Sequence, residues 1–135
     1  MRTLIPAILA AAALAASPAA AIAKEKRTPE EQLSKLLDGR VAGEPKDCIS
    51  LTSIDNSQII DKTAIVYRDG STLWVNRPRS GADSLDDDDV LVTKTTGSQL
   101  CSIDAVQLHD RTSHFWRGFV SLGEFVPYRK VKAAE

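Results

Sequence analysis

Serine, histidine and aspartate side chains occur close together in the segment LHDRTSHFW. His109, Asp110, Ser113 and His114 are the residue types of a nucleophilic triad, but triads are assembled from distant parts of a fold. The sequence also contains neither a Gly-x-Ser-x-Gly nor a His-Glu-x-x-His motif. We therefore assign no catalytic residue. His109 and His114 remain an alternative pair of copper or zinc ligands, although a spacing of five fits neither one helix face nor one strand face.

A second group of chemically active side chains is the acidic run in SGADSLDDDDVLV. A helix-loop-helix calcium site needs acids at alternate positions, a central glycine and a glutamate at the twelfth position, whereas these aspartates are consecutive. In an extended segment only alternate members, such as Asp87 with Asp89, can meet one ion. A weak cation site is thus the alternative. The main prediction is a solvated approach to a strand, partly neutralised by Arg77 and Arg79.

The chain has two cysteines, Cys48 and Cys101. A bridge between them would close a loop of about 50 residues and stabilise the fold by about 4 kcal/mol in the chain-entropy model. The alternative is a metal-binding or reactive pair, which the absence of a Cys-x-x-Cys spacing disfavours. We predict one disulfide.

The N-terminal residues MRTLIPAILAAAALAASPAAAIAKEKR combine one early basic residue, an apolar run and small residues. This pattern predicts a secretory signal peptide over residues 1–23, cleaved after Ala23, with cleavage after Ala21 as the second choice. The apolar run is too short to span a bilayer, which needs about 20 residues; a retained anchor is the alternative. We expect a periplasmic or secreted protein with no membrane span after cleavage, in a compartment where disulfides persist.

Residues 24–46 are predicted to form a charged leader, a short helix and a linker. Thr28 suits the N-cap, Pro29 the first turn and Glu31 the capping box, and Gly39 marks the end. Three leucines share one face of this helix: Leu33, Leu36 and Leu37. A helix of about ten residues has only marginal stability by itself. The narrow apolar stripe therefore predicts that this helix packs on a larger domain as a lid.

The clearest strand pair is the segment TAIVYRDGSTLWVN, residues 63–76. Asp69-Gly70 predicts a type I′ turn, which would place Tyr67 opposite Thr72. One face of this hairpin is wholly apolar and is assigned to the core: Ala64, Val66, Leu73 and Val75. The other carries Tyr67 and Trp74 as diagonal neighbours. That face is either a functional aromatic surface or the seat of the N-terminal helix.

Further strands are expected at residues 48–54, 90–94, 99–102, 105–109 and 114–120, with turns between them, the first at residues 55–57. Many short strands and one helix predict a mainly β fold, a small antiparallel barrel or sandwich with one N-terminal helix, with α+β as the alternative. Residues 47–128 would form a single β-rich domain and residues 129–135 a basic tail.

Four short motifs occur in a fixed order: Asp47-Cys48-Ile49, Trp74-Val75-Asn76-Arg77, Leu100-Cys101 with Asp104, and the segment LGEFVP at 122–127. In these motifs the chain resembles domain-of-unknown-function family 6491, a family of small exported proteobacterial proteins, over roughly residues 40–128. The resemblance implies no activity. It implies that relatives carry two more cysteines, near Ala82 and near Val120 or Ser121, so that Cys48 and Cys101 are the surviving partners of one bridge.

Charge and composition narrow the function classes. The formal net charge of −1 argues against nucleic-acid binding, which needs a concentrated basic face. The leading hypothesis is a noncatalytic periplasmic binding or structural module without a cofactor, which contacts an envelope protein or a small ligand through an exposed face. The residues expected on that face are Tyr67, Trp74, His114 and Trp116. The alternatives are a metal-binding protein, using His109 and His114 or the acidic run, and an uncharacterised small hydrolase.

Overall fold

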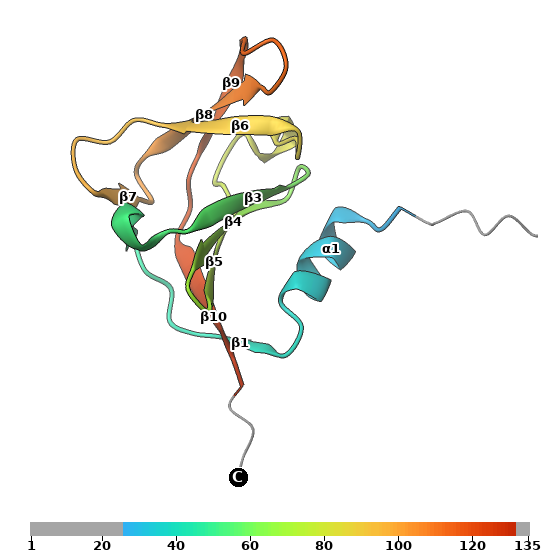
Figure 1. Ribbon diagram of the computed structural model, residues 1–135, viewed down its shortest axis with the longest axis vertical. Coiled ribbons are helices and arrows are strands. Elements are labelled where there is room, and N and C mark those ends of the chain that lie inside the picture. Colours follow the sequence, from blue (N-terminus) through green and yellow to red (C-terminus); the bar gives the residue numbers. More distant parts are fainter. Residues whose placement is uncertain (1–25, 132–135) are drawn as a thin grey trace, which may run out of the picture.

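A computed structural model describes residues 26–131 of the chain (Figure 1). The predicted signal peptide, its cleavage site and residues 132–135 of the predicted tail lie outside the described residues. The helical elements are α1 (Pro29–Leu36), η1 (Leu51–Ser53) and η2 (Ala82–Ser84). The strands are β1 (Arg40–Ala42), β2 (Cys48–Ser50), β3 (Asn56–Ile60), β4 (Ala64–Asp69), β5 (Thr72–Asn76), β6 (Asp89–Thr93), β7 (Gln99–Cys101), β8 (Ala105–Asp110), β9 (Trp116–Ser121) and β10 (Phe125–Lys130). The predicted mainly β fold with one N-terminal α-helix is confirmed.

The strands form three antiparallel sheets. One has the order β1-β10-β5-β4-β3, the second β6-β8-β9, and β2 pairs with β7. Within residues 26–131 these orders are open, so the arrangement is sandwich-like rather than a closed barrel. The main core joins apolar side chains from all three sheets, among them Ile65, Phe125, Leu108, Val120 and Leu100. In Figure 1 the three-stranded sheet lies above the five-stranded one.

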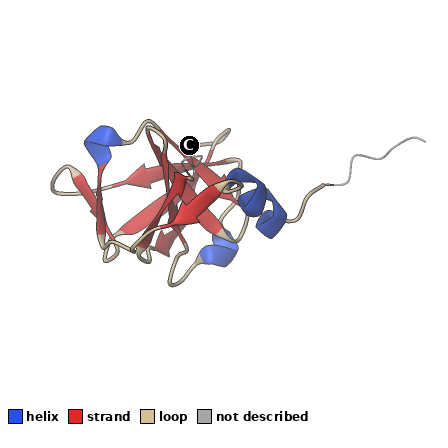
Figure 2. Cartoon of the chain, turned by 90° about the horizontal axis from the view of Figure 1, so that it is seen from below, coloured by secondary structure: helices blue, strands red, loops and turns tan. Residues whose placement is uncertain are grey.

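Helix α1 forms as the sequence predicts. Glu31 donates its backbone N–H to the Thr28 side chain, and the Glu31 carboxylate accepts the N–H of Thr28. Leu33 is 2% exposed and packs on a second apolar cluster that includes Ala64, Val66, Leu73 and Val75. The helix therefore covers one face of the five-stranded sheet, at one side of the strands (Figures 1 and 2). No helix between residues 26 and 131 has the length and apolar character of a membrane span.

The β4–β5 hairpin has a register two residues different from the predicted one, because the turn lies one residue later in the chain. Asp69 pairs with Thr72 and Tyr67 lies directly opposite Trp74, so Gly70 and Ser71 form the turn. The cause is tertiary: Asp55 accepts the Gly70 N–H at 3.0 Å, and Ser53 donates to Asp69 at 3.2 Å. Because side chains alternate with a period of two, a shift of two residues leaves the predicted division between the two faces unchanged.

Several element boundaries differ from the prediction. Residues 40–42 of the expected linker form β1, which pairs with Arg129 and Lys130 of the expected tail in β10. The predicted strand at 48–54 ends at Ser50 and continues as η1, and the predicted turn at 55–57 is the start of β3. Three strands were therefore missed, β1, β3 and β10. The last two lack a clear β pattern, because β3 begins with Asn-Ser-Gln and β10 contains Pro127.

The predicted disulfide is confirmed. Cys48 and Cys101 are opposite each other in the β2–β7 pair, with an S–S distance of 2.06 Å. Both cysteines are thus used in the bridge, so the alternatives of a reactive or metal-binding thiol pair are excluded.

Candidate functional site

Two of the four residues predicted for the binding face lie in the core. Tyr67 is 4% and Trp74 8% exposed, because the three-stranded sheet covers their side of the β4–β5 hairpin. Helix α1 covers the opposite side of the hairpin. The side that carries Tyr67 and Trp74 is therefore neither an exposed functional surface nor the seat of the N-terminal helix. A partner on the surface cannot contact Tyr67 or Trp74. By contrast, His114 is exposed, and Trp116 has 60% of its surface accessible.

Trp116 belongs to an apolar surface that we call the aromatic face, formed by Trp116 and Phe119 of β9 with the neighbouring residues of β6 and β8. Phe119 is 54% exposed. In a regular strand, residues three apart point to opposite sides of the sheet. Here the β8–β9 ladder has an irregularity in which Leu108 pairs with Gly118 and His109 with Trp116. The extra residue, Arg117, allows Trp116 and Phe119 to border the same depression.

The depression on the aromatic face has a volume of about 400 Å³. Its walls are mainly apolar, and two polar side chains line it, those of Gln107 and Lys94. The full lining is Val92, Lys94, Ala105, Gln107, Trp116 and Phe119. An apolar hollow with an amide and an ammonium at its border is suited to an apolar group that carries a hydrogen-bonding or anionic neighbour.

His109 supports this surface from the side. Its Nδ1 lies 3.2 Å from the His114 carbonyl oxygen and its Nε2 lies 3.3 Å from the Gln107 amide. A carbonyl only accepts, so Nδ1–H donates to His114. Nε2 is directed at the Gln107 side-chain oxygen. His109 therefore helps to position Gln107 beside the depression.

The histidine, serine and aspartate cluster does not form a triad. Asp110 Oδ1 accepts the Ser113 hydroxyl at 2.9 Å and the backbone N–H groups of Ser113 and Thr112 at 2.7 and 2.9 Å. These bonds, from the Ser113 backbone first, hold the pKa of Asp110 below its usual value. Asp110 thus closes the β8–β9 turn, while His109 is directed elsewhere. The Ser113 hydroxyl thus pairs with Asp110 and not with a histidine, as a triad would require.

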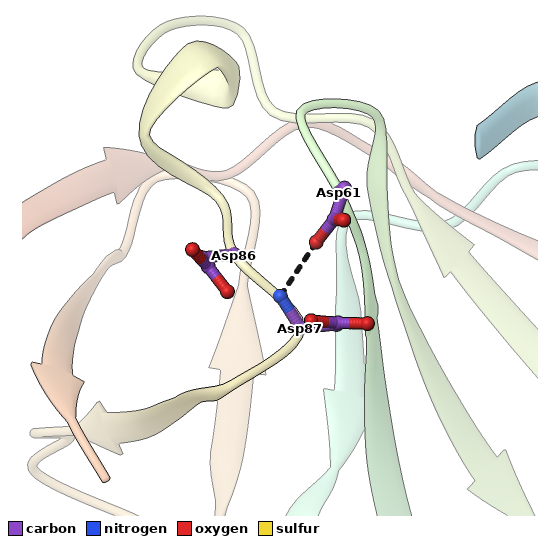
Figure 3. A group of neighbouring side chains, drawn as sticks. All are labelled: Asp61, Asp86 and Asp87. Carbon is purple, nitrogen blue, oxygen red and sulfur yellow. Dashed lines mark hydrogen bonds between the residues drawn. The ribbon is translucent and has the colours of Figure 1, made fainter. Parts of the chain in front are cut away.

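The acidic run is divided between two environments. Asp89 is 3% exposed and both of its oxygens accept from Arg117 Nη1, at 2.7 and 2.8 Å. Asp86 and Asp87 instead lie beside Asp61 from the β3–β4 turn (Figure 3). Asp87 donates its backbone N–H to Asp61 Oδ1 at 2.6 Å. The predicted pairing of Asp87 with Asp89 around one ion is therefore not formed.

The neutralising cations also differ from the prediction. Arg77 pairs with Glu30 of α1 at 3.0 Å, and Arg79 donates to the carbonyls of Leu122 and Ser102. The acidic run instead forms ion pairs with Arg111, which follows β8, and with Arg117, which lies in β9. Sequence order could not reveal this, because Arg117 is 28 residues from Asp89 and reaches it only through the sheet.

Among residues 26–131, one group of side chains is close enough to share a metal ion: Asp61, Asp86 and Asp87, with ligand oxygens within 4.8 Å of one another. Neither His109 nor His114 belongs to it. The group offers three carboxylates, whereas calcium takes six to eight oxygen ligands. Asp61 was missed from the sequence because no local signal links the turn after β3 to the acidic run.

Comparisons with protein-family models, with curated proteins and with solved structures find no match to this chain. The resemblance to domain-of-unknown-function family 6491 therefore remains a prediction. One observation is relevant to it: residues 80–84 pack on β9, and Ser80 bridges to Ser121. The two regions in which the resemblance places the additional cysteines are thus neighbours in this fold.

Proposed function

We propose that this protein is a noncatalytic, exported binding module that holds an envelope protein through the aromatic face. The observation that carries the proposal is the exposure of Trp116 and Phe119 side by side on one depression. Large aromatic side chains are enriched at the centres of protein interfaces, where they supply most of the binding free energy. The disulfide supports export, since such bridges persist in oxidising compartments.

The partner that fits this face presents an apolar side chain next to a carboxylate. The apolar side chain would enter the depression between Trp116 and Phe119. The carboxylate would pair with Lys94, the charged residue that lines the depression. Phe115, in the adjoining turn, is 75% exposed. Exposed apolar patches, such as the one formed by Trp116 and Phe119, are rare on proteins that act as monomers and commonly mark interaction sites.

Site-specific photocrosslinking tests this proposal. Benzoylphenylalanine in place of Phe119, in protein exported by its native cells, should give a discrete adduct after irradiation, and Trp116→Ala should abolish it. The matched control places the same probe at Val41, an exposed apolar residue of β1 in the other sheet. No adduct at position 119, or equal adducts at positions 119 and 41, would refute the aromatic face as a binding surface.

A further inference from the structure

A groove separates the outer edges of two sheets. The five-stranded sheet ends at β3 and the three-stranded sheet ends at β6, and no described strand pairs with either on the outer side. Between them lies a groove of about 450 Å³. Both strands contribute to its walls, with Ser57, Gln58 and Ile59 on one side and Val90 and Leu91 on the other. Gln32 of α1 and Arg111 also line it. In Figure 1, β6 lies above β3 across this gap.

Contacts beyond the ends of β3 and β6 frame the groove. At one end the turn after β3 meets the segment before β6, where Lys62 donates to the Leu85 carbonyl at 3.1 Å and Asp87 donates to Asp61. Outside the groove, before β3 begins and after β6 ends, the Leu51 N–H donates to the Ser98 carbonyl at 2.7 Å. The end of β3 therefore faces the beginning of β6, and the two strands run in opposite directions. Each strand has five residues, which corresponds to about 17 Å of extended chain.

The facing edges lack most of the features that normally prevent strand addition. Proteins protect exposed edges with lysine, proline, bulges or covering segments. Neither β3 nor β6 contains lysine or proline. The one described cover on β6 is Arg111, whose Nη2 donates to the Asp89 carbonyl at 3.4 Å, a long and weak bond. A backbone N–H from an added strand would replace it at little cost.

The charge at the closed end of the groove is negative. Asp87 lines the groove, and its carboxylate lies near those of Asp61 and Asp86; Asp88 follows Asp87 in the chain. Asp86 and Asp88 have distant guanidinium partners, at 3.7 and 3.6 Å. Among the described residues, Asp61 and Asp87 form no ion pair. A ligand with lysine or arginine at this end would supply the missing positive charge.

From the unpaired edges and the charge together, we propose that the groove binds an extended, basic segment of a partner protein as an added β-strand. The segment would form backbone hydrogen bonds with the edge of β6, β3 or both, as in other cases of strand addition. Its lysine or arginine side chain would lie at Asp61 and Asp87. This site is separate from the aromatic face, and each can exist without the other.

Fluorescence anisotropy with a labelled peptide, Lys-Arg-Thr-Val-Thr-Val-Thr-Gly, tests the site on the full exported chain. Two changes should weaken binding. Asp61→Asn with Asp87→Asn removes the charge but keeps the oxygen that accepts from Asp87, and should raise Kd by roughly three- to tenfold, as two surface ion pairs allow. Methylating alternate backbone nitrogens of the peptide should abolish binding, because the ladder loses its donors. Asp83→Asn, an exposed aspartate of η2, and Trp116→Ala are controls that should leave Kd unchanged.

The outcomes separate the alternatives. Binding that requires both the aspartates and the peptide N–H groups, with new amide-exchange protection at Leu91, Ser57 or Ile59, whose N–H groups face away from the paired strands, supports strand addition. Binding that survives N-methylation, or protection mapped elsewhere, refutes it, because charge alone then holds the peptide. Failure of this peptide and of its Lys/Arg-shuffled versions to bind at millimolar concentration also refutes it, and leaves the aromatic-face proposal unaffected.

Discussion

At the scale of single residues, Tyr67 and Trp74 are the most unusual feature of the core. The Tyr67 hydroxyl and the Trp74 indole nitrogen are buried, and neither has a hydrogen-bond partner among the described residues. Burial also raises the pKa of Tyr67 above its usual value. Tyr67 packs edge-on against Phe125, with the ring centroids 5.9 Å apart. Its aromatic ring therefore stabilises the core by packing, while its buried, unpaired hydroxyl lowers the free energy of unfolding.

The variant Tyr67→Phe tests this reading. Removing a buried hydroxyl that has no partner should leave the free energy of unfolding unchanged or raise it by up to about 1 kcal/mol. Urea denaturation of the wild type and the variant measures the difference. Tyr128→Phe, at a partly buried tyrosine of β10, is the control and should have no effect. A loss of 1 kcal/mol or more in Tyr67→Phe would show that the hydroxyl has a partner.

At the scale of elements, the β8–β9 hairpin determines where the aromatic face lies. Asp110 closes its turn through three hydrogen bonds, His114 adopts a φ of 61° there, and the irregularity at Arg117 aligns Trp116 with Phe119. Gly118 permits that irregularity with a φ of 147°, which other residues rarely adopt. The proposed binding surface thus depends on the turn as well as on the aromatic side chains.

Acid should loosen this turn. The pKa of Asp110 is lowered in the folded chain, so its contribution is complete above the ordinary aspartate value of about 3.9 and is lost as the pH falls through the folded value. We expect the Thr112 and Ser113 amide resonances to shift together below that ordinary value as their acceptor is protonated. Asp110→Asn keeps an acceptor oxygen and should show no such titration. Identical titrations in both proteins would contradict this role of Asp110.

The helix and the hairpin faces could be predicted from sequence because their causes are local. Thr28 and Glu31 cap α1 by direct contact, and alternation alone divides the β4–β5 side chains between two faces. The candidate sites could not be predicted in the same way. Asp61 joins the acidic run, and Arg117 reaches Asp89, only because separate strands meet in space. The burial of Tyr67 likewise depends on a second sheet that no local pattern places.

At the scale of the whole molecule, the small β2–β7 sheet ties distant parts of the chain. Its bridge joins Cys48 to Cys101, 53 residues apart, and the intervening chain includes most of the five-stranded sheet and β6. Ile49 and Leu100, buried next to the cysteines, contribute to the main core. The backbone bonds from Leu51 to Ser98 and from Ser102 to Asp47 fix the surrounding loops. The bridge therefore constrains the same body that holds both proposed binding surfaces.

Removing the bridge should destabilise the whole fold without changing either surface. The double variant Cys48→Ala with Cys101→Ala should lose about 4 kcal/mol of unfolding free energy, because the unfolded chain regains the entropy of a loop of that length. Urea denaturation of the variant, of the oxidised wild type and of the wild type in excess reductant measures this, and the last should match the variant. A loss below about 1 kcal/mol would mean that packing around Ile49 and Leu100 alone holds β2 against β7. Native-state binding of the basic peptide at low temperature should persist in the variant, since the groove is built by β3 and β6 rather than by the bridged strands.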